Sequence, residues 1–167
     1  DTDTAGNVKS QTFEFELDAT LAMPTVALTN DTGSNDTDKI TRDAALTFST
    51  AAADVTRTFK INGGTATSSY TAPTTSGDYT VEVIDTDAAG NTKSASITFT
   101  LDVSLDTPTV QLQADGGAQG DGLTNNAALQ ISAAAADVTR TFSINGGTAT
   151  STYTAPTVDG EYTVVVT

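Results

Sequence analysis

The side chains of this sequence that could do chemistry are almost all carboxylates. The chain has 167 residues, with 21 Asp and Glu against 7 Lys and Arg, and it contains no His, Cys or Trp. Histidine or cysteine is needed for a Ser-His-Asp triad, a Cys-His pair or an ordinary zinc site, so these active sites are excluded. A metal ion would have to be held by oxygen ligands, which favours Ca²⁺ or Mg²⁺.

The most distinctive acidic segment is residues 85–91, Asp-Thr-Asp-Ala-Ala-Gly-Asn, which recurs at residues 1–7 as Asp-Thr-Asp-Thr-Ala-Gly-Asn. Two aspartates at alternate positions before a glycine turn are typical of Ca²⁺ ligands, since this ion takes six to eight oxygens at about 2.3–2.6 Å. The same residue types also form ordinary Asx turns. Because the pattern occurs twice, we predict that it binds calcium.

An internal repeat of about 84 residues organises the chain. Residues 58–67 recur at 141–150 with one difference, and Pro24-Thr25-Val26 recurs at 108–110. The offset is 84 before the polar loop at 30–43 and 83 after it. This period is too long for a solenoid unit and suits a small β-sandwich in tandem array.

Alternating apolar and polar residues predict about seven short strands in each repeat. In the first repeat we expect them at residues 25–28, 45–49, 56–61, 66–71 (one or two weak strands), 77–84 and 93–102. Threonine is the commonest residue, which also favours strands. The predicted fold class is all-β, with tandem immunoglobulin-like β-sandwich domains in a Greek key, arranged end to end. Tyr79 and Tyr162 stand where such sandwiches carry a tyrosine corner, although a plain core aromatic is the alternative.

The predicted domain boundaries do not coincide with the ends of the sequence. Residues 1–17 match the last strand of a preceding repeat, residues 18–102 form a complete repeat, and residues 103–167 form a second repeat without its last strand. In residues 8–17, Phe13, Phe15 and Leu17 are expected to face inward and Glu14 and Glu16 outward. We therefore predict that residues 8–17 of one molecule complete the second repeat of the next, in head-to-tail strand exchange.

The elements that position the carboxylates follow from this fold. The loop between the last two strands, the loop between the second and third strands and the start of the first strand share one pole of such a sandwich. We expect calcium ligands there from two repeats and from the N-terminal copy of the loop. The residues are Asp18, Asp54, Asp85, Asp87 and Asn91 in the first repeat, Asp102, Asp106 and Asp137 in the second, and Asp1 and Asp3 in the N-terminal loop. A second ion at the opposite pole would use Asp31, Asp36, Asp38 and, in the second repeat, Asp121.

Other function classes receive little support. A pI near 4.1 argues against nucleic acid and anionic membranes, and no apolar run is long enough to span a membrane. The sequence opens without the basic region of a signal peptide. A glycosidase needs a carboxylate pair, but Glu82 and Glu161 lie singly on exposed strand faces. A lectin would usually offer Trp for stacking on sugars.

Residues 31–41, 85–91 and 101–110, together with the period, resemble the bacterial immunoglobulin-like repeats of giant RTX-type biofilm adhesins. This resemblance implies a non-catalytic extender region that is secreted by a type I system to the bacterial cell surface. In that family tandem domains are held straight by interdomain calcium while a distal domain binds the target. Asp18, Asp102, Asp85 and Asp87 match the family's calcium positions, whereas the second long loop has lost acids. Alternatives are a cadherin-like repeat, or a module that itself binds carbohydrate or protein.

Overall fold

The computed structural model describes all 167 residues as strands, turns and extended chain, without a helix. The chain divides into two compact units, unit 1 from Asp1 to Ser104 and unit 2 from Leu105 to Thr167. It contains no helix of a length and hydropathy that would let it cross a membrane. The all-β prediction is therefore confirmed.

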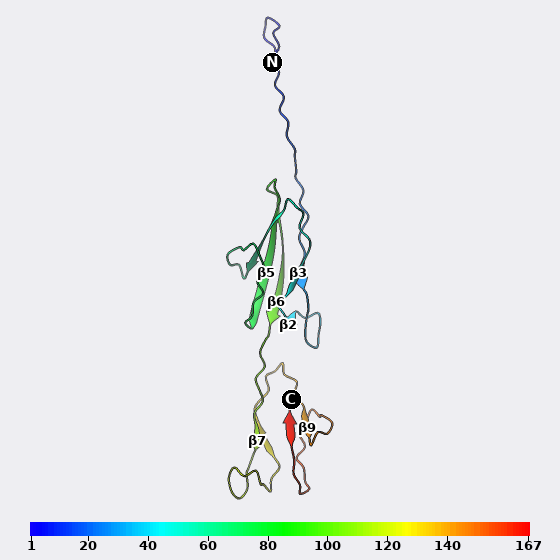
Figure 1. The fold of residues 1–167 in the computed structure, drawn as a ribbon, viewed down its shortest axis with the longest axis vertical. Coiled ribbons are helices and arrows are strands. Elements are labelled where there is room, and N and C mark those ends of the chain that lie inside the picture. Colours follow the sequence, from blue (N-terminus) through cyan, green and yellow to red (C-terminus); the bar gives the residue numbers. More distant parts are fainter. The chain divides into compact units, whose positions relative to one another are not determined.

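Unit 1 is a sandwich of two sheets. Its strands are β1 (Val26–Leu28), β2 (Ile40–Thr41), β3 (Leu46–Phe48), β4 (Thr56–Ile61), β5 (Gly77–Thr86) and β6 (Thr92–Leu101). One sheet is the antiparallel pair β1-β3, and the other has the order β2-β6-β5-β4. The long arrows of β5 and β6 in Figure 1 form an antiparallel hairpin, in which Val81 lies opposite Ile97 and Tyr79 opposite Phe99.

The core of unit 1 depends mainly on the hairpin of β5 and β6. Side chains alternate across a strand, so every second residue of β6 faces the β1-β3 sheet. Ile97, Phe99 and Leu101 are 8, 2 and 1% exposed, and Val81 of β5 is fully buried. Partly buried residues of β1 and β3 pack against this cluster. Three of its buried members therefore come from one strand.

The strand predictions are confirmed except at two places in unit 1. Residues 66–71 form no strand, and only Thr67 makes an isolated bridge to Phe59. The polar loop at 30–43 contains the short strand β2, which was not predicted and pairs in parallel with β6. Its two residues show too little alternation to be recognised. Unit 1 thus has six strands instead of seven.

Residues 8–17 do not form the predicted strand. The segment is extended, and Phe13, Phe15 and Leu17 are 83, 76 and 80% exposed instead of facing a core. The two phenyl rings stack at 6.0 Å, as expected for residues on one face of an extended chain. Beyond Val8 and Lys9, which pair with Thr2 and Asp1, the segment has no backbone partner within the chain, so its pairing with a second molecule stays a prediction.

Unit 2 repeats four strands of the first, and the last two of them are shorter than their counterparts. The four strands are β7 (Val110–Leu112), β8 (Leu129–Ile131), β9 (Phe142–Ile144) and β10 (Val164–Val166). They pair as β7-β8 and β9-β10, both antiparallel. No residue of unit 2 is fully buried, and even Val164, the counterpart of Val81, is only partly buried. Its four strands correspond to β1, β3, β4 and β5 of unit 1.

Candidate functional site

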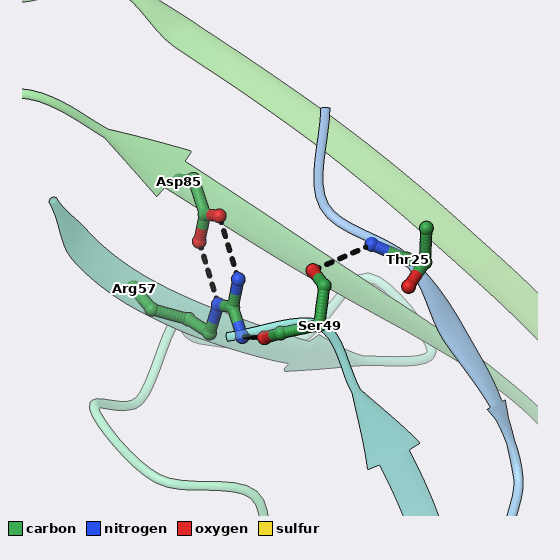
Figure 2. A network of polar contacts seen from close by, with 4 residues as sticks. All are labelled: Thr25, Ser49, Arg57 and Asp85. Atoms are coloured by element: carbon green, nitrogen blue, oxygen red, sulfur yellow. Dashed lines mark hydrogen bonds and ion pairs between the residues drawn. The ribbon is translucent and has the colours of Figure 1, made fainter. Parts of the chain in front are cut away.

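Arg57, in β4, is the centre of a polar network in unit 1. Its Nε and Nη2 donate to the two carboxylate oxygens of Asp85 at 2.7 Å each, and its Nη1 donates to the carbonyl of Ser49. The Ser49 hydroxyl accepts a hydrogen bond from the Thr25 amide, as Figure 2 shows. The Asp85 carboxylate beside the guanidinium raises the pKa of Arg57, although burial opposes this effect. Four segments of the sandwich are thereby joined.

Unit 2 contains this network without its carboxylate. Arg140 Nη1 donates to the carbonyl of Ser132, and the Thr109 amide donates to the Ser132 hydroxyl at 3.1 Å. These contacts match those of Arg57, Ser49 and Thr25 residue by residue. No acid of unit 2 pairs with Arg140.

The Asp87 loop is closed by its own side chains. The carboxylate of Asp87 accepts the backbone amide and the side-chain amide of Asn91, both at 2.8 Å. Those bonds, led by the one from the Asn91 side chain, lower the pKa of Asp87. Gly90, with φ at 91°, supplies the left-handed turn. The hydrogen bonds from Asn91 to the Asp87 carboxylate are those of an Asx turn.

The N-terminal copy of the loop has the same geometry. Asp3 accepts the amide of Asn7 at 2.9 Å and its side-chain nitrogen at 2.8 Å, and this bonding lowers the pKa of Asp3. The ammonium group of Asp1 donates to the carbonyl of Lys9, and Thr2 bridges to Val8. The loop therefore holds its shape although every residue of it is exposed.

Three of the predicted ligands of unit 1 line one shallow pocket. Asp54, Asp85 and Asp87 lie there beside residues 20–24. The linker also reaches this pole, because the Asn91 side chain donates to the carbonyl of Asp18 at 3.1 Å. Their carboxylates are not gathered closely, since no three acidic side chains in the chain form a group that could hold a metal ion.

The long loop at the other pole is organised around Thr41, which is 2% exposed. Its hydroxyl donates to the carbonyls of Asn30 and Asp43, and Asp31 accepts the amide of Lys39. In unit 2 Thr124 bonds to the carbonyls of Ala114 and Asn126 in the same way.

Both long loops bury one carboxylate oxygen that has no hydrogen-bond partner. The atoms are Oδ1 of Asp31 and Oδ1 of Asp115, which occupy equivalent places in the two repeats. The second oxygen of Asp115 accepts the Gly120 amide at 2.6 Å. An unpaired buried carboxylate oxygen is costly, and an ion is one way of satisfying it.

The other predicted ligands are dispersed. Asp36, Asp106 and Asp137 are exposed, Asp38 accepts the Ile40 amide, and Asp121 accepts the Leu123 amide. Asp102 is half-buried in unit 1 and accepts the Ser104 amide, while Asp106 and Asp137 belong to unit 2.

The donor set of unit 1 fits calcium better at one pole than at the other. Asp85 already has its charge neutralised by Arg57 through both oxygens, and Asp87 is bonded by Asn91. The long loop instead offers a buried carboxylate oxygen without a partner. The chemistry of the residues therefore favours Asp31 over Asp85 as a cation ligand.

The fold and these contacts agree with a comparison against known families. Residues 20–103, just over half of the chain, match the model of the bacterial Ig-like domain. The chain belongs to this family. Among curated proteins, none matches the chain.

A feature of Ig-like domains explains the positions of two tyrosines. Tyr79 opens β5, and its hydroxyl donates to the carbonyl of Thr75, four residues upstream, at 2.8 Å. Tyr162 makes the same bond to Val158 in unit 2. This is the geometry of the predicted tyrosine corner. Another tyrosine, Tyr70, donates its hydroxyl to the carbonyl of Ala44. Burial, together with the negative charge of the nearby Asp43, raises the pKa of Tyr70 to about 12.

Sequence reasoning missed three residues of this Ig-like repeat. Arg57 recurs as Arg140 within a repeated segment, and a cation repeated in so acidic a chain was a usable signal of a partner for the acids. Thr41 gave no signal, because threonine is abundant everywhere in the chain. Asp115 recurs at the position of Asp31, and only its burial distinguishes it from other loop acids.

Proposed function

We propose that this chain is a non-catalytic spacer segment of a bacterial surface protein, an extender of a cell-surface adhesin in which Ig-like repeats follow one another in tandem. The observation that carries the proposal is the repetition of the same internal contacts in both units. Tyr70 and Tyr153 bond to equivalent carbonyls, and Asn62 and Asn145 bond to the opposing strand alike. Units that share the same internal contacts suit a repeated mechanical role.

A module that itself binds a ligand would be expected to differ from its neighbour at the binding surface. The pocket of unit 1 is lined mostly by small or aliphatic residues of segments 20–24 and 49–55, without an aromatic side chain. Sugars are commonly bound by stacking on aromatic rings, and the chain has no Trp. These features favour the spacer over a carbohydrate-binding module.

The acidity of the chain suits an extracellular location where calcium is abundant. The chain has a formal net charge of -14, so its acidic groups repel one another in the folded state. A sandwich of about 84 residues is only marginally stable. Calcium at the long loops would be held by Asp31 and Asp115 with neighbouring carbonyls. It would neutralise buried negative charge and stabilise the folded form by mass action. Export by a type I system would then deliver a loosely folded chain that stiffens outside the cell.

The test is thermal unfolding and small-angle scattering in millimolar calcium and in chelator. With the affinity usual for extracellular modules, about 10⁻⁴–10⁻³ M, calcium should raise the melting temperature by roughly 5–10 °C and reduce flexibility. The D31N/D115N double variant should lose most of that response. A matched control is D159N, which changes an exposed acid outside both loops.

An unchanged melting temperature and scattering profile in calcium would reject the calcium part of the proposal. A response that the D31N/D115N variant retains and a variant of Asp54, Asp87 and Asp18 loses would place the ion at the other pole. A rigid scattering profile without calcium would still support a spacer.

A further inference from the structure

Each unit contains one Asn-Gly pair, and both pairs lie in the same turn. Asn62-Gly63 follows β4 and Asn145-Gly146 follows β9, whereas no other asparagine of the chain precedes a glycine. Asparagine is a thermolabile residue, and its side chain is open to attack by the next backbone nitrogen where the next residue has no Cβ. These two turns are therefore the places where the backbone can react with its own side chain.

The reaction needs only water as a second reactant. The backbone nitrogen of Gly63 attacks Cγ of Asn62 and closes a succinimide ring, while the side-chain nitrogen leaves as ammonia with the proton that the Gly63 amide gives up. Water then opens the ring in one of two ways. Breaking the new bond between this nitrogen and Cγ gives aspartate, and breaking the original peptide bond gives isoaspartate, in which Cβ becomes part of the main chain.

In folded unit 1 the side-chain amide of Asn62 is held by the neighbouring strand. Its Oδ1 accepts the Thr80 amide at 2.7 Å, and its Nδ2 donates to the carbonyl of Asp78 at 3.2 Å. The backbone amide of Asn62 also donates to the carbonyl of Thr80 at 2.8 Å. We call these three bonds the Asn62 clamp. Attack on Cγ makes that carbon tetrahedral and releases Nδ2, so the side-chain bonds of the clamp are lost in the reaction.

The backbone of the turn is fixed as well. Asn62 and Gly63 have φ of 49° and 70°, and the Gly64 amide donates to the carbonyl of Ile61 at 2.9 Å. Two successive left-handed residues are what an Asn-Gly hairpin turn requires. Asn62 and Gly63 are both exposed, so water reaches them freely. The clamp and the turn geometry, not burial, therefore oppose the reaction.

Unit 2 has the same contacts around its own Asn-Gly pair. Oδ1 of Asn145 accepts the Thr163 amide at 2.8 Å, and its Nδ2 donates to the carbonyl of Glu161 at 3.3 Å. Asn145 and Gly146 have φ of 50° and 70°. The clamp uses backbone groups of the neighbouring strand, so it is kept although Asp78 of unit 1 is replaced by Glu161 in unit 2.

We propose that Asn62 and Asn145 are modification sites at which water converts the side-chain amide to an acid, and that the clamp suppresses this reaction until the turn opens. Local unfolding frees the side chain for as long as the turn stays open. The product cannot rebuild the clamp, since a carboxylate has no proton to donate to the Asp78 carbonyl. Isoaspartate also lengthens a turn whose length sets the strand register. Openings of a repeat are thereby recorded in the chain as a covalent change.

The first experiment incubates the chain at mildly alkaline pH, folded in buffer and unfolded in denaturant, and measures conversion at each asparagine by peptide mapping with mass spectrometry. In the unfolded chain Asn62 and Asn145 should react roughly tenfold faster than Asn91, because Asn91 precedes a β-branched threonine instead of a glycine. Folding should slow both sites by roughly tenfold or more, because only the open fraction reacts. Equal rates at Asn62 in the folded and unfolded chain overturn the proposal, as do equal rates at Asn62 and Asn91 in the unfolded chain.

A denaturant series below the unfolding midpoint tests the clamp itself. The Thr80 amide is one of its donors, so its hydrogen exchange reports the same opening that frees the Asn62 side chain. Exchange at Thr80 and conversion at Asn62 should rise in parallel with denaturant. Exchange that rises while conversion stays constant overturns the proposal.

Two matched variants test the effect of the product on unit 1. N62D is the aspartate product itself and should lower the melting temperature by roughly 4–8 °C, because a hydrogen bond of the clamp is lost. T65D adds the same charge at an exposed position after the same turn and should melt close to the parent chain. Equal melting temperatures of N62D and T65D would show that the acid keeps the clamp, which overturns the proposal.

Discussion

Arg57 is the residue on which the acidic pole of unit 1 depends. Its guanidinium lies between a carboxylate at the end of β5 and a carbonyl just after β3, and both partners are largely shielded from water. A shielded ion pair is weak evidence of net stabilisation, but removing one partner leaves the other charge buried and unpaired. The carboxylate of Asp85 thus needs Arg57 more than a surface acid would.

We predict that R57A destabilises unit 1 by about 3 kcal/mol, because Asp85 is then left without its counter-charge. R140A is the matched control in unit 2, where no carboxylate is paired, and it should cost clearly less in dilute solution. Urea unfolding followed by hydrogen exchange of β4 and β9 separates the two units. Equal losses would mean that the guanidinium acts through its carbonyl bond alone.

The Asp87 loop should respond to acid. Its folded pKa lies below the ordinary value of 3.8, chiefly through the Asn91 side chain. A lowered folded pKa means that the stability contributed by this group is present above about pH 4 and is lost as the pH falls through the folded pKa. N91A should therefore raise the Asp87 pKa toward 3.8 and reduce the acid sensitivity of the loop.

Carboxyl carbon shifts of Asp87, titrated by NMR in the parent chain and in N91A, check this prediction. Asp3 has the same bonds to Asn7 and serves as the control, because its pKa should not move in N91A. Identical titrations of Asp87 in the two proteins would contradict the assigned cause.

Among single residues, the sequence predicted positions better than contacts. Alternation predicted the strands at 77–84 and 93–102, and the structure buries Val81, Ile97 and Phe99 on them, since period-two burial follows from the geometry of a strand. The pairing of Asp85 with Arg57 depends on the register of β4 against β5, which no local pattern reveals. In the acid-rich segment 85–91, Asp85 was predicted to be a metal ligand, and in the structure it forms an ion pair with Arg57.

At the level of elements, β6 decides whether a repeat has a core. Unit 1 buries Ile97, Phe99 and Leu101 from this strand, and unit 2, without it, has no fully buried residue. The effect extends to the neighbouring strands, since β10 has three residues where β5 has ten. In these repeats a strand is stabilised more by its pairing with a neighbouring strand than by the β propensity of its own residues.

We predict that unit 2 unfolds before unit 1 in dilute solution. Three apolar side chains at about 1.5–3 kcal/mol each suggest a difference of roughly 5 kcal/mol or more in the free energy of unfolding. Native-state hydrogen exchange should give β9 amides much lower protection than β4 amides. Equal protection at concentrations too low for association would show that the half-exposed face of unit 2 is sufficient for folding.

Element prediction succeeded where strands were long or bounded by strong turns, as for β4 before the Asn62-Gly63-Gly64 turn. It failed for β2, which consists of two residues held by hydrogen bonds to β6. For residues 8–17 the alternation is clear but no pairing partner lies within the chain, so the strand exchange predicted for them stays a prediction. Alternation predicts which face a strand would bury, and pairing decides whether the strand forms.

For the whole molecule, the repeat explains the distribution of charge. Seventeen of the 21 acids are aspartates, and most lie in loops rather than in the paired strands. Both copies keep the same buried carboxylate in the long loop, and both keep the arginine after the Asp-Val-Thr segment. Part of the acidity of the chain therefore belongs to the architecture of each repeat.

The position of β6 also has a mechanical consequence. Tension on the chain enters unit 1 near Asp18, beside the start of β6, and leaves at Leu101, where β6 ends. The pull then runs along a strand that is hydrogen-bonded to β5 over its whole length and to β2 at its end. Ladder bonds lie roughly across the strands, so this load shears them together instead of opening them one at a time. Rupture of unit 1 requires many bonds to fail at once.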